Sequence, residues 1–437
     1  MRCTWLPTYC STRSGRLVPL HYEVVLIEKI FDNFGPFHEP LIRLSEMPEP
    51  VVHHLEATDY VAESAWKKGQ DGVVSRAEPL TTLCCEDSNT HEVDTVFNLA
   101  FSVKKSDLKN ITERILSQGG EVIEAPTEVS DEHGKISYAI VKSNCGNIVH
   151  TLINKDEYSG PFLAGFDVVE NSENIECDST ELKISGIDHV TFACYSGNSE
   201  RVIRFYERCF GMKRFQISNN DDEDNGLILA DGVGLRLKAM QYWRCAETGL
   251  SYNKSSNPAN AFMLVVVESL KGQTNCNVLT YLKQHKNEGV EHVALTSSSI
   301  EHTVSKLKGR GVTFRVPPKA YYDELVKTNK LVGLGQNVDS LLNLGILLDN
   351  ENDSCEASTE ESEIQKKYLM QIFSHPIFNL KTFFFEIIQR IGARGLGSGN
   401  ILALVRSIRE EERRNLMKSE AKKQEISEEA ITCPRQC

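Results

Sequence analysis

Two histidines stand at the same position of two similar short segments. The segments are Ile187–Phe192 and Val290–Leu295, and each carries its histidine third, at His189 and at His292. Apolar residues recur at every second position in both, as in a strand that packs one face against a core. Two strand-borne imidazoles that face the same side would supply half of a metal site.

A carboxylate that could complete such a site is Glu386. It lies within Lys381–Gln389, an aromatic and β-branched segment that predicts a buried strand, where a carboxylate requires a partner. Phe384, Glu386 and Ile388 would share one face. Two histidines and one carboxylate that bind a non-haem iron(II) ion would leave some of its coordination positions open. Zinc with three protein ligands fits the same residue types, and a lone strand histidine is often an ordinary core or edge residue.

The elements that must position these residues form an internal repeat. A third segment, Val96–Phe101, matches the two histidine segments but has Asn98 in their place, which predicts a related unit without metal. Each of the three leads into a segment of helical period that ends near a glycine, and then into a further strand. The expected helices are Asp107–Leu116, Glu200–Cys209 and Ile300–Leu307. The expected following strands are Glu121–Glu124, Lys213–Ile217 and Val312–Val316.

Length and composition limit the classes of function. A chain of 437 residues has room for two or three domains. The net charge of −13, without a basic stripe, argues against nucleic-acid binding. The longest apolar run, Ala261–Val267, is too short for a transmembrane segment. The 13 cysteines show no CxxC spacing, which favours a reducing compartment. Residues 1–22 contain arginines and hydroxyl residues but no acid, which predicts mitochondrial targeting.

Longer motifs resemble a known family, 4-hydroxyphenylpyruvate dioxygenase of the vicinal-oxygen-chelate superfamily. The motifs are Gly160–Phe166, Tyr368–Phe373, Thr382–Arg390 and Gly395–Asn400. The resemblance covers residues 90 to 412 and is nearest to the dioxygenase-like subgroup of animal mitochondria.

This resemblance implies an α+β fold in which paired βαβββ modules form two half-open barrel domains. The implied divisions are a targeting segment at 1–22, a metal-free N-terminal domain at 23–168, a linker at 169–182, an iron-binding domain at 183–412 and a charged tail at 413–437. A C-terminal helix that begins near Gly395 would cover the site.

The resemblance also implies roles for individual residues. His189, His292 and Glu386 match the ligands of Fe²⁺. Residues that match the lining of the substrate pocket are Gln371, Phe373, Phe384 and Asn400. Leu396 stands where the family has phenylalanine, Asn277 aligns with a pocket glutamine, and Glu291 replaces a glutamine beside His292.

The implied function is oxidation of a small 2-oxo acid by O₂. The preferred reaction converts 4-hydroxyphenylpyruvate to 4-hydroxymandelate, for synthesis of the ubiquinone head group. The alternatives are formation of homogentisate in tyrosine breakdown and a metal-binding scaffold without turnover. A homodimer is a further expectation.

Overall fold

The computed structural model describes most of the chain between residues 95 and 403. The described residues are 93, 95–160, 163–164, 182–218, 220–230, 232–242, 263–274, 276–328, 331, 334–351, 367–378, 380 and 382–403, together with the two-residue strands β1 (Cys3–Thr4), β2 (Cys10–Ser11) and β3 (Leu17–Val18). The tail at 413–437, the linker apart from Leu182, and the rest of the targeting segment lie outside them.

The N-terminal part is one mixed sheet with a helix on one face. Its elements are β4 (Ala100–Ser102), the short helix η3 (Lys105–Asp107), α4 (Leu108–Ser117), β5 (Val122–Asp131), β6 (Gly134–Lys142) and β7 (Val149–Asn154). The strand order is β1-β4-β7-β6-β5, and the first strand, β4, is parallel to the last, β7. This is one βαβββ unit.

The C-terminal sheet contains two units of the same kind. The first unit and the helix that follows it comprise β8 (Ile184–Cys194), α5 (Ser199–Phe210), β9 (Met212–Phe215), β10 (Leu227–Leu229), β11 (Leu235–Tyr242), β12 (Met263–Ser269) and α6 (Asn277–His285). The second comprises β13 (Gly289–Ser297), α7 (Ile300–Gly309), α8 (Lys319–Lys327), α9 (Val338–Leu344), β14 (Leu347–Asn350), β15 (Tyr368–Phe373) and β16 (Phe384–Ile391).

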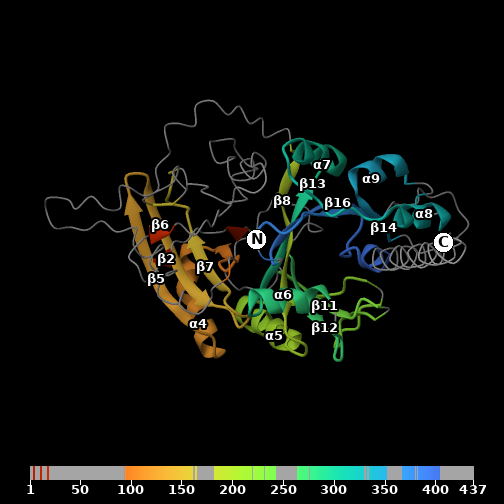
Figure 1. Cartoon of the computed structure of the whole chain (residues 1–437). Coiled ribbons are helices and arrows are strands. Elements are labelled where there is room, and N and C mark those ends of the chain that lie inside the picture. Colours follow the sequence, from red (N-terminus) through yellow and green to blue (C-terminus); the bar gives the residue numbers. More distant parts are fainter. Residues whose placement is uncertain are drawn as a thin grey trace, which may run out of the picture.

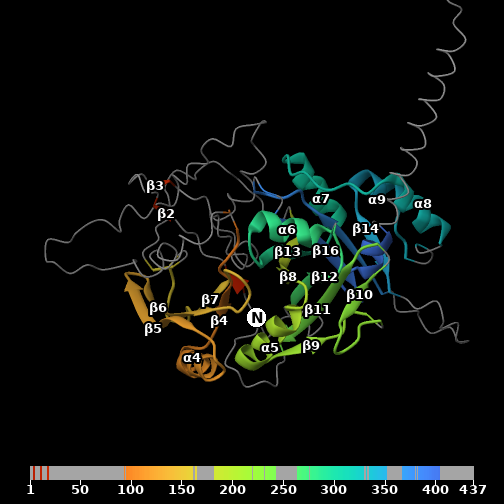
Figure 2. The ribbon, with the colours of Figure 1, turned by 60° about the horizontal axis from the view of Figure 1, so that its bottom comes forward.

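The two units join at their first strands. The order is β10-β11-β12-β8-β13-β16-β15-β14, with β9 beside β11. β8 and β13 are antiparallel at the centre, and each is parallel to the last strand of its own unit, β12 or β16. Figures 1 and 2 show this sheet beside the N-terminal one, with α4 next to α5. The C-terminal sheet is thus a pair of βαβββ modules, and the whole has the expected α+β fold; the second module expected in the N-terminal domain lies outside the described residues.

Most expected elements have their counterparts, with one clear exception. Helices α4, α5 and α7 lie within two residues of their predicted limits at each end. The strand predicted at Val312–Val316 is wrong, because only an isolated bridge pairs Phe314 with Ser374. Pro317 and Pro318 follow, and proline cannot donate to a ladder. Asn98 lies just before β4, where it forms a bridge with Val149 of β7.

One hydrophobic core crosses the boundary between the two parts. It joins Leu99 and Ile111 on one side to Val190 and Phe210 on the other. Polar contacts cross as well: the Nε2 atom of His150 lies 2.7 Å from the hydroxyl oxygen of Tyr206 on α5. The N-terminal unit is therefore part of the packing that supports β8. Within the described part of the chain, no helix combines the length and apolarity needed to span a bilayer.

The buried His150 predicts a pH-dependent stability. Burial lowers the pKa of its imidazole from 6.5 to about 4, opposed only by a hydrogen bond with the Leu99 carbonyl. The folded protein binds this proton more weakly than the unfolded chain does. The free energy of unfolding should therefore fall as the pH drops from 6.5 to about 4, by up to about 1.4 kcal/mol per pH unit from this residue.

Urea unfolding curves between pH 4.5 and 7.5 would measure that slope. His150→Gln should flatten it. An equal slope in wild type and His150→Gln would contradict the assignment.

Candidate metal centre

The three predicted ligands lie on three neighbouring strands. His189 is on β8, His292 on β13 and Glu386 on β16, and these strands are adjacent in the sheet. The Nε2 atoms of the two histidines are 3.4 Å apart, and the Glu386 Oε2 atom lies 3.4 Å from His189 Nε2 and 3.5 Å from His292 Nε2. Among the described residues, these three form a group of potential metal ligands in which the ligating atoms all lie within 4.8 Å of one another.

The strand register explains why the three side chains meet. Ala294 of β13 lies directly between His189 on β8 and Glu386 on β16. His292 precedes Ala294 by two positions on the same strand, so it projects from the same face. The methyl side chain of Ala294 is short, and the three longer side chains can converge above it. A larger residue at this position would occupy that space.

Each histidine is oriented by the acidic residue that precedes it. The register of β8 and β13 shifts at Asp188 and again at Glu291, so each acid occupies a bulge. A bulge interrupts the alternation of faces and redirects a side chain, and each acid reaches its histidine neighbour. Asp188 Oδ1 lies 2.7 Å from His189 Nδ1, and Glu291 Oε2 lies 3.1 Å from His292 Nδ1. A proton held on each Nδ1 leaves each Nε2 free to bind a metal.

Arg390 fixes the first of these acids. Its Nε and Nη2 atoms donate to the two carboxylate oxygens of Asp188 at 2.6 and 2.8 Å. Burial raises the pKa of Asp188, but the charge and hydrogen bonds of Arg390, together with His189, lower it further than burial raises it. Asp188 therefore stays ionised beside the imidazole. Arg390 also donates to the carbonyl oxygen of Gly395, which links the site to the glycine-rich segment.

The cluster fits a divalent metal ion. A triangle with sides of 3.4–3.5 Å has its centre about 2.0 Å from each corner, close to the bond length from nitrogen or oxygen to such an ion. The second carboxylate oxygen of Glu386, Oε1, is buried without a hydrogen-bond partner. An ionised group in this state requires a positive charge nearby. The donor atoms suit zinc and iron alike.

Both histidines bind a proton more tightly than a free imidazole does. Burial lowers the pKa of His189, but the hydrogen bonds and charges of Asp188 and Glu386 raise it overall, to about 9. The pKa of His292 is raised in the same way by Glu291 and Glu386. Burial raises the pKa of Glu386, and the two histidines lower it overall. The site thus favours positive charge, which a metal ion supplies in place of protons.

Three of the predicted pocket residues lie beside the cluster. Phe373 of β15 is directly opposite Glu386, and Gln371 is two residues away on the same face. The Phe384 ring stacks on the His292 ring at a centroid distance of 4.8 Å. Both polar atoms of the buried Gln371 amide lack a partner. The inner face thus holds polar groups without partners next to aromatic rings, as a site for a polar aromatic ligand requires.

The other three pocket predictions have different outcomes. Leu396 is buried in an apolar cluster with Met263 and Val265, which lie on the same face of the sheet as His189. Asn400 is buried, and its Oδ1 atom accepts a hydrogen bond of 2.8 Å from the Tyr321 hydroxyl. Asn277 is exposed at the first residue of α6. This position differs from the buried or half-buried positions of the other five residues, and the place of Asn277 in the pocket stays a prediction.

The glycine-rich segment before the C-terminal helix is held by carboxylates. Glu351 accepts hydrogen bonds from the backbone of Arg394 and Gly395, at 2.9 and 2.8 Å, and Asp349 accepts one of 2.9 Å from Gly399. Gly397 has φ +68°, and a side chain there would collide with Gln371. These contacts place the start of the helix, from Ser398, next to Gln371.

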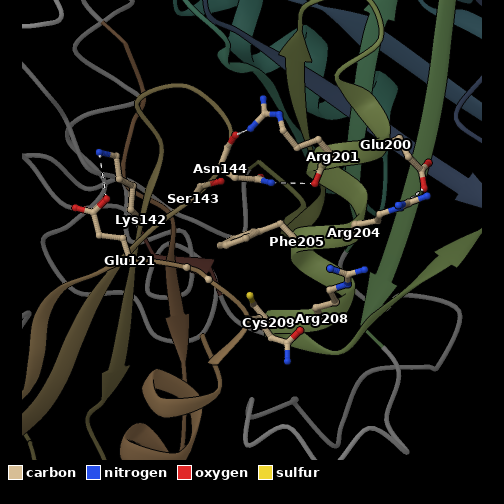
Figure 3. Close-up of a pocket in the computed structure, with 13 residues that line it drawn as sticks. Glu121, Lys142, Ser143, Asn144, Glu200, Arg201, Arg204, Phe205, Arg208 and Cys209 are labelled. Atoms are coloured by element: carbon tan, nitrogen blue, oxygen red, sulfur yellow. Dashed lines mark hydrogen bonds and ion pairs between the residues drawn. The ribbon is translucent and has the colours of Figure 1, made fainter. Parts of the chain in front are cut away.

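A separate cleft of about 570 Å³ lies between the two parts of the chain. Figure 3 shows it between α5 and the N-terminal sheet, with Phe205 pointing toward it. The cations around it are largely neutralised: Lys142 pairs with Glu121, Arg204 with Glu200, and Arg201 with Glu288. None of the three metal-ligand candidates lines it, so the cleft is distinct from the metal centre.

Comparison with known proteins agrees with this arrangement. Residues 186–329 match the profile described as Glyoxalase/Bleomycin resistance protein/Dioxygenase superfamily. The chain is 33% identical over 330 residues to the human 4-hydroxyphenylpyruvate dioxygenase-like protein, covering 74% of this chain and 80% of that protein. It is 28% identical over 327 residues to 4-hydroxyphenylpyruvate dioxygenase of Dictyostelium discoideum, with 74% and 80% covered.

A solved structure shares the fold. It is a triple mutant of 4-hydroxymandelate synthase from Streptomyces coelicolor, with a TM-score of 0.52 and 23% sequence identity, and the likeness covers 76% of this chain and 80% of that one.

The role assigned to Asp188 leads to a quantitative prediction. Asp188→Asn should weaken metal binding by about 10–100-fold, because the partner that orients His189 is altered. It should also lower the free energy of unfolding by about 3–5 kcal/mol, because Arg390 keeps a buried charge without its counter-ion. Titration calorimetry with Mn²⁺ and urea unfolding measure the two effects.

Glu291→Gln is the matched control, since its amide oxygen needs to accept only the proton of His292 Nδ1, whereas in Asp188→Asn one amide oxygen replaces two carboxylate oxygens that serve both Arg390 and His189. It should change both quantities less. Equal metal affinity in Asp188→Asn and wild type would contradict the orienting role.

Proposed function

Because this chain belongs to the 4-hydroxyphenylpyruvate dioxygenase family, we propose that it is an iron(II)-dependent dioxygenase that converts 4-hydroxyphenylpyruvate to 4-hydroxymandelate. The observation that carries the proposal is the convergence of His189, His292 and Glu386, with a buried carboxylate oxygen left without a partner. Two histidines and one carboxylate favour non-haem iron over closed structural zinc sites, because open positions remain for a substrate and O₂.

The proposed reaction balances without another reductant. One O₂ and one 4-hydroxyphenylpyruvate give one CO₂ and one 4-hydroxymandelate. The bond between the carboxylate and the keto carbon breaks, and that keto carbon becomes the new carboxylate with one oxygen atom from O₂. The other oxygen atom forms the hydroxyl on the benzylic carbon. Bound iron would supply the redox chemistry that couples these two oxidations.

The chain's own residues prepare the site. Asp188 and Glu291 hold the Nδ1 protons, so the two Nε2 atoms face the reacting region. Arg390 keeps Asp188 in place. Phe373 and Phe384 meet edge to face at a centroid distance of 6.1 Å, and they form an aromatic wall beside His292 for the substrate ring. The unpartnered amide of Gln371 is a hydrogen-bonding group suited to the phenol.

Oxygen uptake and product analysis test the proposal. Purified protein loaded with Fe²⁺ should consume O₂ and release an equal amount of CO₂ when 4-hydroxyphenylpyruvate is added. Glu386→Gln should lower the rate by at least about a hundredfold, since even loss of a ligand's partner costs 10–100-fold. Zinc-loaded wild type should consume none. An iron-loaded protein without substrate-dependent uptake would support the scaffold alternative instead.

The product distinguishes the two dioxygenase reactions. 4-Hydroxymandelate and homogentisate have the same formula, so chromatography against both standards is required. Our proposal of benzylic attack is supported by Leu396: an aliphatic residue in place of a ring removes a stacking contact worth about 0.5–1.5 kcal/mol. A substrate ring held less firmly can tilt and bring the benzylic carbon closer, since a displacement of about 1 Å changes rates on the order of a hundredfold.

Leu396→Phe should therefore tighten substrate binding by up to about tenfold and shift the product toward homogentisate. Leu396→Met, which keeps a similar volume without a ring, is the control and should preserve the product ratio. Because Leu396 is buried, urea unfolding should accompany the assay to detect overpacking of about 1–3 kcal/mol. An unchanged ratio in a stably folded Leu396→Phe protein would remove Leu396 from the account.

A further inference from the structure

A buried threonine lies between the two histidines on the inner face, which is the face of the C-terminal sheet that carries the three metal ligands. Thr191 of β8 is directly opposite His292 of β13. His189, two positions earlier on β8, is directly opposite Ala294. Residues that pair across an antiparallel ladder project from the same face, so these four occupy the corners of one small rectangle. The two histidines stand at diagonal corners, and the two short side chains stand at the others.

The two short side chains lie on opposite sides of the histidine pair. Ala294 is paired with Glu386 on β16, so the carboxylate reaches the histidines from the Ala294 corner. Thr191 is paired with Val265 on β12, in the opposite direction across the sheet. The side of the histidine pair that faces away from Glu386 therefore lies above Thr191.

The Thr191 hydroxyl is buried against apolar neighbours. Ala193, two positions later on the same face, belongs to one buried cluster with Met263, Val265 and Leu396. Thr191 is 2% exposed, and its Oγ1 atom has no hydrogen-bond partner within the described part of the chain. A buried hydroxyl in this state has lost its hydrogen bonds to water without replacing them.

Other polar groups of the inner face are in the same condition. Oε1 of Glu386 and both polar atoms of the Gln371 amide are buried without a partner among the described residues. Each such group costs free energy in the protein alone, and a group that contacts a bound ligand recovers that cost. Valine has nearly the shape of threonine and would avoid the cost at position 191. The hydroxyl is therefore suited to a ligand and not to packing.

We propose that the Thr191 hydroxyl donates a hydrogen bond to the carboxylate of the bound 2-oxo acid, on the side of the histidines that faces away from Glu386. This inference rests on the proposed function and adds a substrate-binding residue to it. The Cβ atoms of directly opposite residues are about 4.5–5.5 Å apart, so an oxygen atom held beside His292 is next to the hydroxyl. Among the acceptors of such an acid, the charged carboxylate forms the stronger hydrogen bond.

Stability without metal or substrate tests the premise. Thr191→Val should raise the urea midpoint, because it removes a buried hydroxyl that has no partner. The matched control is Thr151→Val in the N-terminal sheet, where the buried Thr151 hydroxyl lies 2.9 Å from Asn98 Nδ2. Its midpoint should fall, since Asn98 loses a partner. A midpoint of Thr191→Val at or below that of wild type would show that the hydroxyl already has a partner in the protein, and would overturn the inference.

Binding without turnover tests the contact itself. Protein loaded with Mn²⁺ in the absence of O₂ is titrated with 4-hydroxyphenylpyruvate in a calorimeter. Thr191→Val should weaken binding by about 10–100-fold, as expected when a hydrogen bond to a charged group is lost, and should leave Mn²⁺ affinity unchanged. Thr191→Ser keeps the hydroxyl and should bind the acid nearly as tightly as wild type. Thr151→Val should bind it as wild type does.

Three results of the titration would overturn the inference. Equal affinity of Thr191→Val and wild type for the acid would mean that the hydroxyl makes no contact, and only the role of Thr191 would fail. An equal loss in Thr191→Ser would assign the effect to the methyl group. A parallel loss of Mn²⁺ affinity would mean that Thr191 only supports the histidines. If wild type itself does not bind the acid, the proposed function fails, and the inference fails with it.

Discussion

The convergence of three side chains above Ala294 is the constraint on which the rest of this structure depends. Strands in a sheet keep fixed spacings, so residues on β8, β13 and β16 can meet only if the residue between them is small and the registers are held. A slip of one residue would turn a ligand to the opposite face. The shared core of both parts, which packs against the far side of β8 and β13, resists such a slip.

The three acids of the site can be buried in ionised form because each one contacts a basic side chain. Asp188 faces Arg390, Glu291 faces His292, and Glu386 faces both histidines. The two bulges are what make this possible, since regular strands would direct each acid and its neighbouring histidine to opposite faces. The irregularities of the central ladder are therefore part of the site and not defects of the sheet.

The sequence pattern was sufficient to predict the three metal ligands but not the residues that orient them. Alternation and equivalence between segments predicted that His189 and His292 lie at the same position of equivalent strands, and an acid within an aromatic strand predicted Glu386. The roles of Asp188 and Arg390 could not be predicted, because a bulge leaves no trace in an alternating pattern and the two residues are 202 positions apart. Helices α8 and α9 did not enter the repeat pattern either, since the other units lack counterparts to them.

The parallel pairing of the first and last strands of each unit has a consequence for synthesis of the chain. The edge of β8 that faces away from β13 stays unpaired until β12 has been synthesised. The edge of β13 that faces away from β8 stays unpaired until β16 has been synthesised, and α7, α8 and α9 are made in between. Pairings between such distant segments form slowly. Because Glu386 belongs to β16, the nascent chain displays two histidines long before it displays the carboxylate. The complete set of three ligands exists only after β16 has been synthesised, so a metal ion that binds earlier would meet two histidines without the carboxylate.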